Sequence, residues 1–298
     1  MKKQLRCSIL LLFATVIWGS AFVSQSVGMD HIGPFTFQAA RCAVAFLGLL
    51  PVIAITDCFK KDGQSFLKRW ADPRLWKAGL LCGIPLFLAC NLQQVGLVDT
   101  DAGKSGFLTA MYIVIVPLIG IFLKRKVTIM VPISVAIAVV GLYFLSCVGV
   151  TKINIGDLLT IGCAIMFAVQ ITFIDVFAQN TDALRLNAIQ ALVCSVLSAC
   201  VMLFTETPTW SGIGNCTLPL LHTGLLSMGL AYYLQIIGQK HLDTTPASLI
   251  MSLESVFAAL FGALILKETM TGWEILGCVL VFTAVILSQI PVGKKVTV

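Results

Sequence analysis

The sequence predicts an all-α membrane protein with ten transmembrane helices, arranged as two inverted five-helix repeats. The first observation is composition: 58% of the 298 residues are hydrophobic, 11% are charged, and the mean hydropathy is +0.97. So much apolar surface cannot be hidden inside one soluble core. The second observation is a series of apolar runs of about 20 residues, the length that crosses a bilayer as a helix. The third is that the two halves of the chain resemble each other.

Ten apolar segments follow one another with short polar breaks. Each run is continuous and lacks the alternation of a barrel strand, so helices are expected, because lipid offers no partner to unbonded backbone groups. The longest polar connection, residues 57–74, is too short for a soluble domain. The expected helices occupy residues 8–27, 34–56, 75–98, 101–123, 128–148, 156–178, 184–205, 218–239, 246–266 and 271–291.

The internal repeat appears when the second half is placed over the first. An offset of 149 residues pairs Trp18 with Phe167 and Arg41 with Gln190, and an offset of 145 residues aligns the later helices. Each half holds an odd number of spans, so the second copy must enter the membrane from the opposite side. Inverted repeats are the usual plan of secondary transporters, which bind substrate near the midplane where the halves meet.

Lys and Arg residues are distributed unevenly between the two ends of the predicted helices. With a cytoplasmic N-terminus, sixteen of the 20 basic residues fall inside, three fall outside, and Arg41 lies within a span. This positive-inside signal places both termini in the cytoplasm of an inner or plasma membrane protein. It also explains the net charge of +6 without a nucleic-acid partner. The inner set is Lys2, Lys3, Arg6, Lys60, Lys61, Lys68, Arg69, Arg74, Lys77, Lys124, Arg125, Lys126, Arg185, Lys240, Lys294 and Lys295, and the outer set is Lys104, Lys152 and Lys267.

Two features resemble those of secreted proteins. The basic residues at the N-terminus precede an apolar run, as in a signal peptide. We expect this segment to be retained as the first helix, because its removal would leave nine spans and delete the counterpart of the helix that contains Phe167. The eleven cysteines form no CxxC pair, and most lie within apolar spans, where free Cys behaves as a small hydrophobic residue. Neither a disulfide scaffold nor a metal site is expected, and Cys216 is expected to be exposed on the outer face.

Two ionisable residues stand out because they lie well inside predicted spans, where a charge costs about 3 kcal/mol to insert. Arg41 lies about 10 Å below the outer end of its helix, and Glu254 about 12 Å above the inner end of its helix. The functional interpretation makes Arg41 an anchor for an anionic group and Glu254 a coupling site for a proton or cation. The alternative is structural: Arg41 reaches the interface or bonds helix carbonyls, and Glu254 is capped by neighbouring hydroxyls.

Uncharged polar side chains within the spans complete the candidate site. Amides and phenols can bond a small polar solute without the full cost of burying a charge, although they can also bond between helices, for about 1 kcal/mol or less. Trp18 lies mid-span, away from the interfaces where Trp is common, and can wall a pocket or pack helices. The wider polar set also contains Gln93, Thr172 and Tyr233. The predicted substrate-binding residues are Trp18, Gln38, Arg41, Asn91, Gln94, Tyr112, Gln170, Gln190, Tyr232 and Gln235.

Several stretches form a pattern that extends over nearly the whole chain, from about Leu10 to Gln289. They are residues 18–22, 37–41, 154–159, 245–260 and 267–268. Together they resemble the EamA-type transporters of the drug/metabolite transporter superfamily, in which an Arg is common at the position of Arg41. The resemblance implies ten helices, a central cavity and alternating access. Ser255 departs from the pattern, because the family usually has Pro there, and this puts a kink at that point in doubt.

The sequence thus predicts a secondary transporter that exports a small polar or amphipathic metabolite, such as an amino acid. The resemblance adds that known members move amino acids, metabolites, sugars or drugs, often outward. The chain has no Gly-x-x-x-x-Gly-Lys-Ser/Thr run, so it is not expected to use ATP directly. We place the repeats in residues 1–150 and 151–298. The expected partners are a small-molecule solute and the lipid bilayer, with no cofactor, metal or nucleic acid. The solute, the coupling ion and the oligomeric state stay open.

A membrane-embedded lipid-modifying enzyme is the alternative from another class. It would need a nucleophile or an acid–base set at a membrane face. His31, His222 and His241 lie near helix ends and form no His-x-x-x-x-Asp or His-x-x-x-His pattern, and acidic residues are too sparse for a Mg²⁺-diphosphate motif. We therefore expect no enzyme. A channel, the third possibility, would conduct without saturation.

Overall fold

The computed structural model describes residues 2–60, 65–100, 102–124, 126–127, 129–146, 148, 154–265, 267, 269–290 and 296–297. It is an all-α membrane protein, as predicted. Within these residues, eight helical segments are long and apolar enough to cross a membrane, and two shorter apolar helices accompany them, ten in all. The spanning segments are α1 (Lys2–Met29), α2 (Pro34–Cys58), α4 (Pro73–Gly96), α5 with α6 (Ala102–Ala110 and Tyr112–Phe122), α7 (Met130–Ser146), α8 (Ile155–Phe177), α9 (Ala183–Thr205), α11 with η2 and α12 (Thr217–Leu221, His222–Ala231 and Tyr232–Gln239), α13 with α14 (Thr244–Met251 and Leu253–Ile265) and α15 (Gly272–Ser288).

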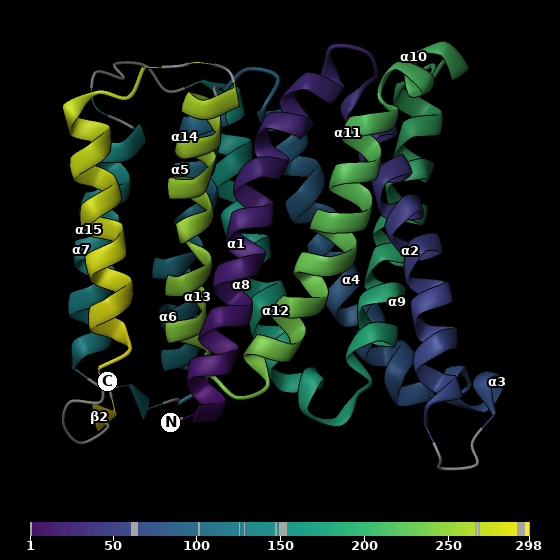
Figure 1. Cartoon of the computed structure of the whole chain (residues 1–298), viewed down its shortest axis with the longest axis horizontal. Helices are drawn as coiled ribbons and strands as arrows, with labels where there is room; N and C mark the ends of the chain where they lie inside the picture. The colour runs from purple at the N-terminus through teal and green to yellow at the C-terminus, as the bar shows by residue number, and fades with distance from the viewer. Residues whose placement is uncertain are drawn as a thin grey trace.

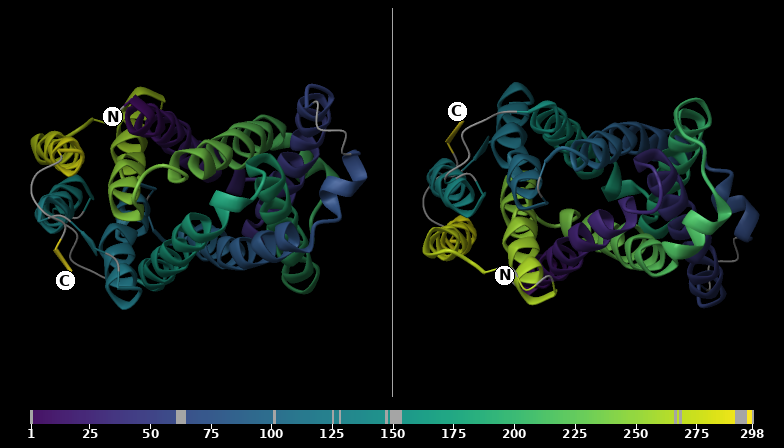
Figure 2. Two further views of the ribbon diagram at one scale, coloured as in Figure 1. Left: turned by 90° about the horizontal axis from the view of Figure 1, so that it is seen from below. Right: turned by 90° about the horizontal axis from the view of Figure 1, so that it is seen from above.

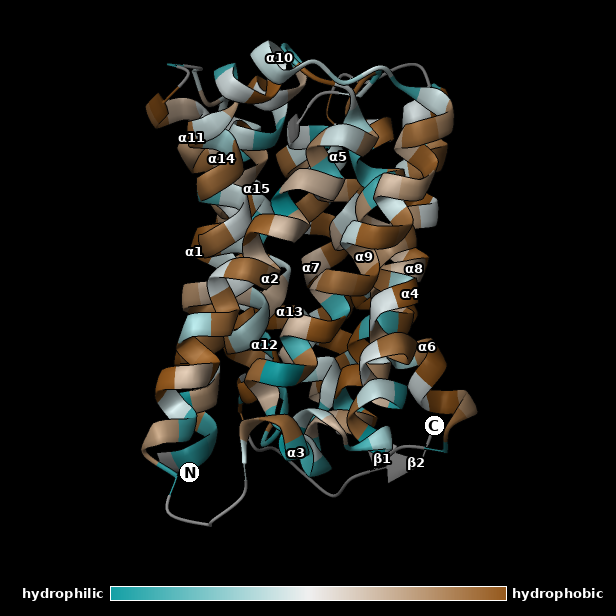
Figure 3. Ribbon diagram, turned by 90° about the vertical axis from the view of Figure 1, so that its right-hand side faces the viewer, coloured by the Kyte–Doolittle hydropathy of each residue, from teal (hydrophilic) through white to brown (hydrophobic). Residues whose placement is uncertain are grey.

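Short elements connect the spans at both ends of the bundle. They are α3 (Phe66–Trp70), η1 (Ala178–Asn180), α10 (Trp210–Asn215) and two-residue strands, β1 (Lys126–Val127) and β2 (Val296–Thr297), which pair antiparallel. The start of α1, α3 and the β1–β2 pair lie at one end, which we call the N-terminal face, and α10 lies at the other, the α10 face (Figures 1 and 3). Of the residues named above, Lys61, Arg125, Lys152, Glu268, Lys294 and Lys295 lie outside the described part of the chain.

Helix boundaries follow from capping side chains. Asn154 and Asp157 form a capping box at the start of α8, and Thr271 and Glu274 form another at the start of α15. Pro73 occupies the first turn of α4, where its missing N–H costs nothing. The helices α7 and α15 each have 17 residues, fewer than predicted, and are about 26 Å long. That length is close to the thickness of the hydrocarbon layer.

The helices pack in a pattern that repeats in the two halves. In the first half α1 contacts η2 and α12, and in the second half α8 contacts α4 in the equivalent way. Likewise, α1 packs on α13 and α14, while α8 packs on α5 and α6. Two pairs join equivalent helices directly: α2 with α9 at one end of the long axis, and α7 with α15 at the other (Figures 1 and 2). This exchange of partners is what two inverted repeats produce.

The α7–α15 pair shows how closely these backbones approach. A Cβ placed on Gly277 would lie 2.6 Å from the carbonyl oxygen of Gly141, and one on Gly141 would lie 2.8 Å from Cβ of Leu280. Glycine at both positions lets the helices touch, as is common in membrane bundles. Phe144 stacks on Trp273 at 5.2 Å between ring centroids and extends the contact toward the α10 face.

Many large apolar side chains are exposed on the outside of the bundle, and hydrophobic residues predominate along the helices (Figure 3). Leu47, Leu264 and Ile286 are examples, with exposed fractions of 62%, 75% and 64%. Such a surface would make a water-soluble protein aggregate, whereas lipid covers it without cost. The expectation for Cys216 was wrong: the residue is fully buried, and its thiol donates to the carbonyl oxygen of Gly28 at 3.2 Å. It faces inward because the turn between α10 and α11 lies over the ends of α1 and α2.

Candidate functional site

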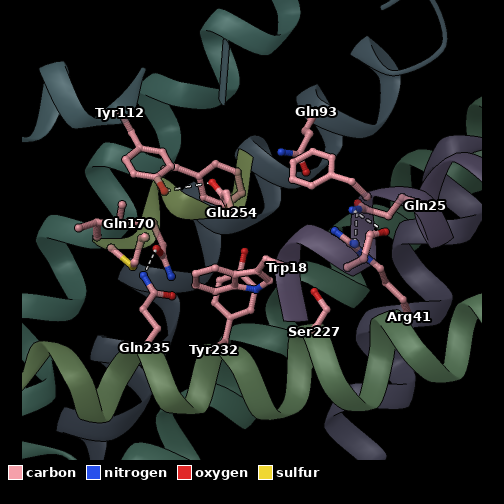
Figure 4. A pocket seen from close by; sticks show the side chains of 15 residues that line it. Trp18, Gln25, Arg41, Gln93, Tyr112, Gln170, Ser227, Tyr232, Gln235 and Glu254 are labelled. Carbon is pink, nitrogen blue, oxygen red and sulfur yellow. Dashed lines mark hydrogen bonds between the residues drawn. The ribbon is translucent and has the colours of Figure 1, made fainter. Parts of the chain in front are cut away.

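A central cavity lies between the two halves and receives side chains from both (Figure 4). The space between its walls amounts to about 490 Å³. Of the residues predicted from the sequence, the structure places seven on its wall: Trp18, Arg41, Tyr112, Gln170, Tyr232, Gln235 and Glu254. These side chains come from α1, α2, α6, α8, α12 and α14, so the cavity depends on contacts between the repeats.

Two interrupted helices meet at the cavity. The fourth span breaks at Met111, between α5 and α6, and the ninth breaks at Ser252, between α13 and α14. The Ser252 hydroxyl donates to the carbonyl oxygen of Leu249 at 2.8 Å, a bond that competes with the helical ladder. Ser255 donates to the carbonyl oxygen of Gly106 at 2.8 Å and ties the two broken helices together. The ninth span is therefore interrupted although no proline stands at position 255.

A carboxyl group lies where these broken helices touch. The Tyr112 hydroxyl donates to Oε1 of Glu254 at 3.0 Å, and both side chains are buried, with exposed fractions of 3% and 8%. Each residue is ten positions past the start of its broken helix, Ala102 or Thr244, which is about 15 Å along the axis. The pair thus sits near the middle of the membrane. Its hydrogen-bond partner is a neutral hydroxyl, so this end of the cavity presents a carboxyl group without a cation bonded to it among the described residues.

A guanidinium lies at the other end of the cavity in Figure 4. Arg41 donates from Nη1 to Oε1 of Gln25 at 2.7 Å, and Gln25 in turn donates to the carbonyl oxygen of Ala21 at 3.3 Å. Arg41 is 3% exposed, and its Nε has no hydrogen-bond partner among the described residues. Arg41 therefore neither reaches the interface nor bonds helix carbonyls, the two structural alternatives. Its planar fork faces the cavity with donors to spare.

Aromatic rings line another part of the cavity wall. Trp18 and Tyr232 meet edge to face, with centroids 5.1 Å apart and an interplanar angle of 65°. Phe167, the counterpart of Trp18 in the second repeat, also lines the cavity. The indole Nε1 of Trp18 is buried and has no partner in the described part of the chain. This part of the cavity is thus apolar and carries one additional donor.

Four predicted binding residues do not lie on the cavity wall, and three of them bond to a neighbouring helix. Gln38 donates to the sulfur atoms of Cys42 and Cys194 at 3.2 and 3.3 Å. Asn91 donates to the carbonyl oxygen of Phe87 and to Oγ of Ser198, both at 2.8 Å. Gln94 and Gln190 are fully buried and also stay off the wall. Gln190 bonds to Gln170 in α8 and to Asn187, whereas both polar atoms of Gln94 have no hydrogen-bond partner in the described part of the chain.

Three polar residues on the wall, Gln25, Gln93 and Ser227, are absent from the predicted substrate-binding residues. Gln25 lies seven positions after Trp18, on the same face of α1, so helical spacing from Trp18 could have found it. Gln93 belonged to the wider polar set, and it donates from Nε2 to Oγ1 of Thr109 at 2.9 Å. Ser227 lies within η2, a π-helical stretch that nothing in the sequence announces.

Comparison with known proteins agrees with this architecture. A model of the EamA-like transporter family matches residues 5–147 and again residues 154–289. The chain belongs to the EamA-like transporter family. An uncharacterized transporter of Archaeoglobus fulgidus is 33% identical over 97% of this chain and 88% of its own length. The uncharacterized transporter YoaV of Bacillus subtilis is 24% identical over 96% of this chain and 97% of its own.

A solved structure shows the same fold. One protein crystal structure superposes with a TM-score of 0.79 at 17% identity, covering 95% of this chain and 96% of its own. This EamA-like protein is therefore a multi-pass membrane transporter of the drug/metabolite type. The transporter names of the relatives favour transport over catalysis. Its cavity, with a guanidinium at one end and a carboxyl group at the other, is the candidate solute site.

Proposed function

We propose that this EamA-like transporter exports a small zwitterionic metabolite of the amino-acid class by alternating access. The observation that carries the proposal is that one cavity is lined by Arg41, by the Trp18–Tyr232 pair and by Glu254 with Tyr112, with Arg41 on the opposite side from Glu254 in Figure 4. A guanidinium can bind a carboxylate at two points. A carboxylate at the far end attracts an ammonium group, and the aromatic wall covers the apolar part of the solute. A polar but uncharged solute would leave both charged groups unmatched.

The inverted repeats support alternating access. The charged groups lie near the middle of the membrane, and the walls come from both repeats, so the halves can expose the same site to either side by moving against each other. Export is the direction common among the transporters that the chain resembles. We place the boundary between the repeats at residues 150 and 151, between the two stretches that match the family.

Glu254 supports a proton-coupled mechanism. Its described hydrogen bond comes from the neutral hydroxyl of Tyr112, not from a cation. A buried carboxyl group in such a setting can exchange a proton when the cavity opens to either side, and ionisable residues inside membranes commonly act in this way. A bound ammonium group and a proton would compete for the same carboxylate, which couples their movements.

The basic residues support an orientation with the N-terminal face in the cytoplasm. Lys3 and Arg6 in α1, the residues around α3, and Lys240 after α12 gather at this face, whereas Lys104 lies at the α10 face. Loops rich in Lys and Arg remain on the cytoplasmic side. We propose that the protein resides in the plasma membrane with both termini inside. A reporter fused after residue 298 should report cytoplasm, and an external report would contradict the orientation.

Counterflow into proteoliposomes tests the proposed solute. Amino acids that raise the melting temperature of the purified protein are assayed with wild-type protein, Arg41→Lys and Arg41→Gln. Affinity for carboxylate solutes should fall in Arg41→Lys, which keeps the charge but loses the fork, and fall further in Arg41→Gln. Equal losses for charged and neutral solutes, with a lower melting temperature, would assign Arg41 to structure. Gln94→Met, which changes a buried glutamine away from the wall, is the control.

The same vesicles test the coupling proposal. Glu254→Gln keeps the hydrogen-bonding shape but cannot release a proton, so it should abolish pH-dependent transport while the folded yield stays near wild type. Normal pH dependence in this variant would remove Glu254 from the mechanism. Analysis of the recovered solute distinguishes transport from catalysis, since a transporter returns the solute unchanged.

A further inference from the structure

We infer that a chain of four buried amide side chains holds the carbonyl oxygen of Gln235 toward the cavity, so that this part of the site selects a hydrogen-bond donor on the solute. This chain of hydrogen-bonded amides runs from η2 through α9 and α8 to α12. Each of its four members bonds to another helix, and it ends on the cavity wall. The inference rests on the proposed function in one respect, that the solute occupies this cavity.

The chain begins at backbone carbonyls, which fix its direction. Nδ2 of Asn187 donates to the carbonyl oxygens of Met228 and Gly229 at 3.1 and 2.7 Å. Both acceptors lie within the π-helical stretch η2, and the Gly229 oxygen, which also accepts from the backbone N–H of Tyr232, has a second lone pair for the side chain. A carbonyl can only accept, so the Asn187 amide cannot be turned round without losing both bonds. Its Oδ1 must therefore face the next member of the chain.

Each following amide has the same donor-to-acceptor orientation as the one before it. Nε2 of Gln190 donates to Oδ1 of Asn187 at 2.8 Å, and Nε2 of Gln170 donates to Oε1 of Gln190 at 3.3 Å. Nε2 of Gln235 then donates to Oε1 of Gln170 at 3.4 Å. All four side chains are at most 2% exposed. Because an amide carries its donor and its acceptor on opposite branches, the orientation of one determines that of the next.

The last member leaves an acceptor without a partner. Oε1 of Gln235 is buried and has no hydrogen bond within the described residues, and Gln235 lines the cavity. In Figure 4 this oxygen lies on the side toward Trp18. Leaving a buried acceptor unsatisfied is unfavourable, and a donor on the solute would remove that cost. An ammonium group can supply that donor. The keto oxygen of a 2-oxo acid is itself an acceptor and cannot bond to Oε1 of Gln235.

Gln190 is the position at which to test the chain, because it does not touch the cavity. It is a positioning residue that acts through Gln170 and Gln235. A protonated Glu at position 190 would reproduce both bonds, accepting from Gln170 and donating to Asn187. A Met of similar length would make neither bond, so the Gln170–Gln235 pair could turn round and present an NH₂ group to the cavity. A merely structural role would rank the variants the other way, since Met suits an apolar interior better than Glu.

The first experiment measures selectivity. L-leucine, L-phenylalanine and the corresponding 2-oxo acids are compared as competitors of counterflow by purified wild-type protein, Gln190→Glu and Gln190→Met. We expect the preference for the amino acid to fall about tenfold in Gln190→Met, equivalent to one hydrogen bond to a charged group, and to be retained in Gln190→Glu. An unchanged preference in Gln190→Met would overturn the inference.

The second experiment needs no solute. Melting temperatures in detergent are compared for Gln190→Met, Gln235→Met and the double variant. The two residues do not hydrogen-bond to each other, yet a continuous chain makes their effects non-additive, because either change already interrupts it. Gln94→Met combined with Gln235→Met is the matched control and should be additive. Additive effects for positions 190 and 235 would overturn the inference. A non-additive result without amino-acid binding would retain the chain and refute the proposed solute.

Discussion

The helices α2 and α9 are held together at each end by a carboxylate. The two carboxylates occupy equivalent positions in the repeats but bind different partners. At the N-terminal face, Asp57 near the end of α2 forms an ion pair with Arg185 in the first turn of α9. At the α10 face, Glu206 just after α9 accepts from the backbone N–H groups of Phe35 and Thr36, in the first turn of α2, at 2.9 and 2.8 Å. The offset of 149 residues relates Asp57 to Glu206 and Thr36 to Arg185. The position of the carboxylate is repeated, but its partner is not.

The residue before each helix explains the difference. Asp182 caps α9 by accepting from the N–H of Arg185 at 3.1 Å, so the carboxylate of Asp57 is left to bind the guanidinium. Its counterpart before α2 is Gly33, which has no side chain to cap the helix. Glu206 supplies that cap from the neighbouring helix, and a Cβ on Gly33 would come within 2.5 Å of its carboxylate oxygen. A helix without its own cap takes one from its partner.

The N-terminal end carries the larger charged network. Arg185 is 1% exposed and lies over the rings of Phe66 and Trp70 in α3, at 5.8 and 5.5 Å from their centroids. Asp182 also binds Lys60, at 2.7 Å, where both side chains are about one-third exposed. The centre of the network is buried and its edge is exposed to solvent, which screens the charges there. Its members should therefore contribute unequally to the free energy of unfolding.

The largest expected effect is that of Asp57→Asn. The change leaves the guanidinium of Arg185 buried without its closest carboxylate, a situation that costs about 3–5 kcal/mol. Unfolding by heat or SDS in detergent micelles should show the loss. Asp57→Asn combined with Arg185→Met should recover part of it, because the stranded charge is gone. A double variant no more stable than the single one would mean that Asp57 acts without Arg185.

Glu206→Ala should have a smaller effect, a loss of about 1–2 kcal/mol, because it removes a helix cap and not the partner of a buried charge. The same unfolding measurement applies. Gly33→Asp placed in the Glu206→Ala background should restore stability, since the new side chain can cap α2 once the crowding carboxylate is gone. This double variant would make the α10 face resemble the N-terminal face. Failure to rescue would show that the Glu206 contact is more than a cap.

The smallest effect is expected from the exposed rim. Burial raises the pKa of Asp182, but the hydrogen bonds from Lys60 and from the Arg185 N–H, with the charges of both residues, lower it more, so the pKa lies below its ordinary value. The carboxylate therefore stabilises the fold above the unfolded pKa of about 3.9, and that contribution is lost as the pH falls through the lower folded pKa. Asp182→Asn should cost under about 1 kcal/mol at pH 7, and less in 1 M salt. A difference that stays constant as the pH falls below about 3.9 would contradict this account.

Several features could be recognised only in the tertiary structure, although the residues that form them are evident in the sequence. The ninth span is interrupted at Ser252, where the hydroxyl bonds the carbonyl oxygen of Leu249, although position 255 holds no proline. Cys216 looked exposed because it lies in a polar connection, yet the turn that holds it packs over α1 and α2. Two carbonyl oxygens of the π-helical stretch η2 accept hydrogen bonds from the side chain of Asn187, which lies about forty residues away in the sequence.

The sequence alone predicted the helices and the family, because the length of apolar runs and the spacing of motifs are properties of the chain itself. Only the tertiary structure decided which polar side chains face the cavity. Gln38 and Gln25 lie at similar depths, yet Gln38 bonds cysteines between helices while Gln25 lines the wall beside Arg41. A helix surrounded by lipid and other apolar helices carries little amphipathic signal, so its rotation is set by packing against its neighbours.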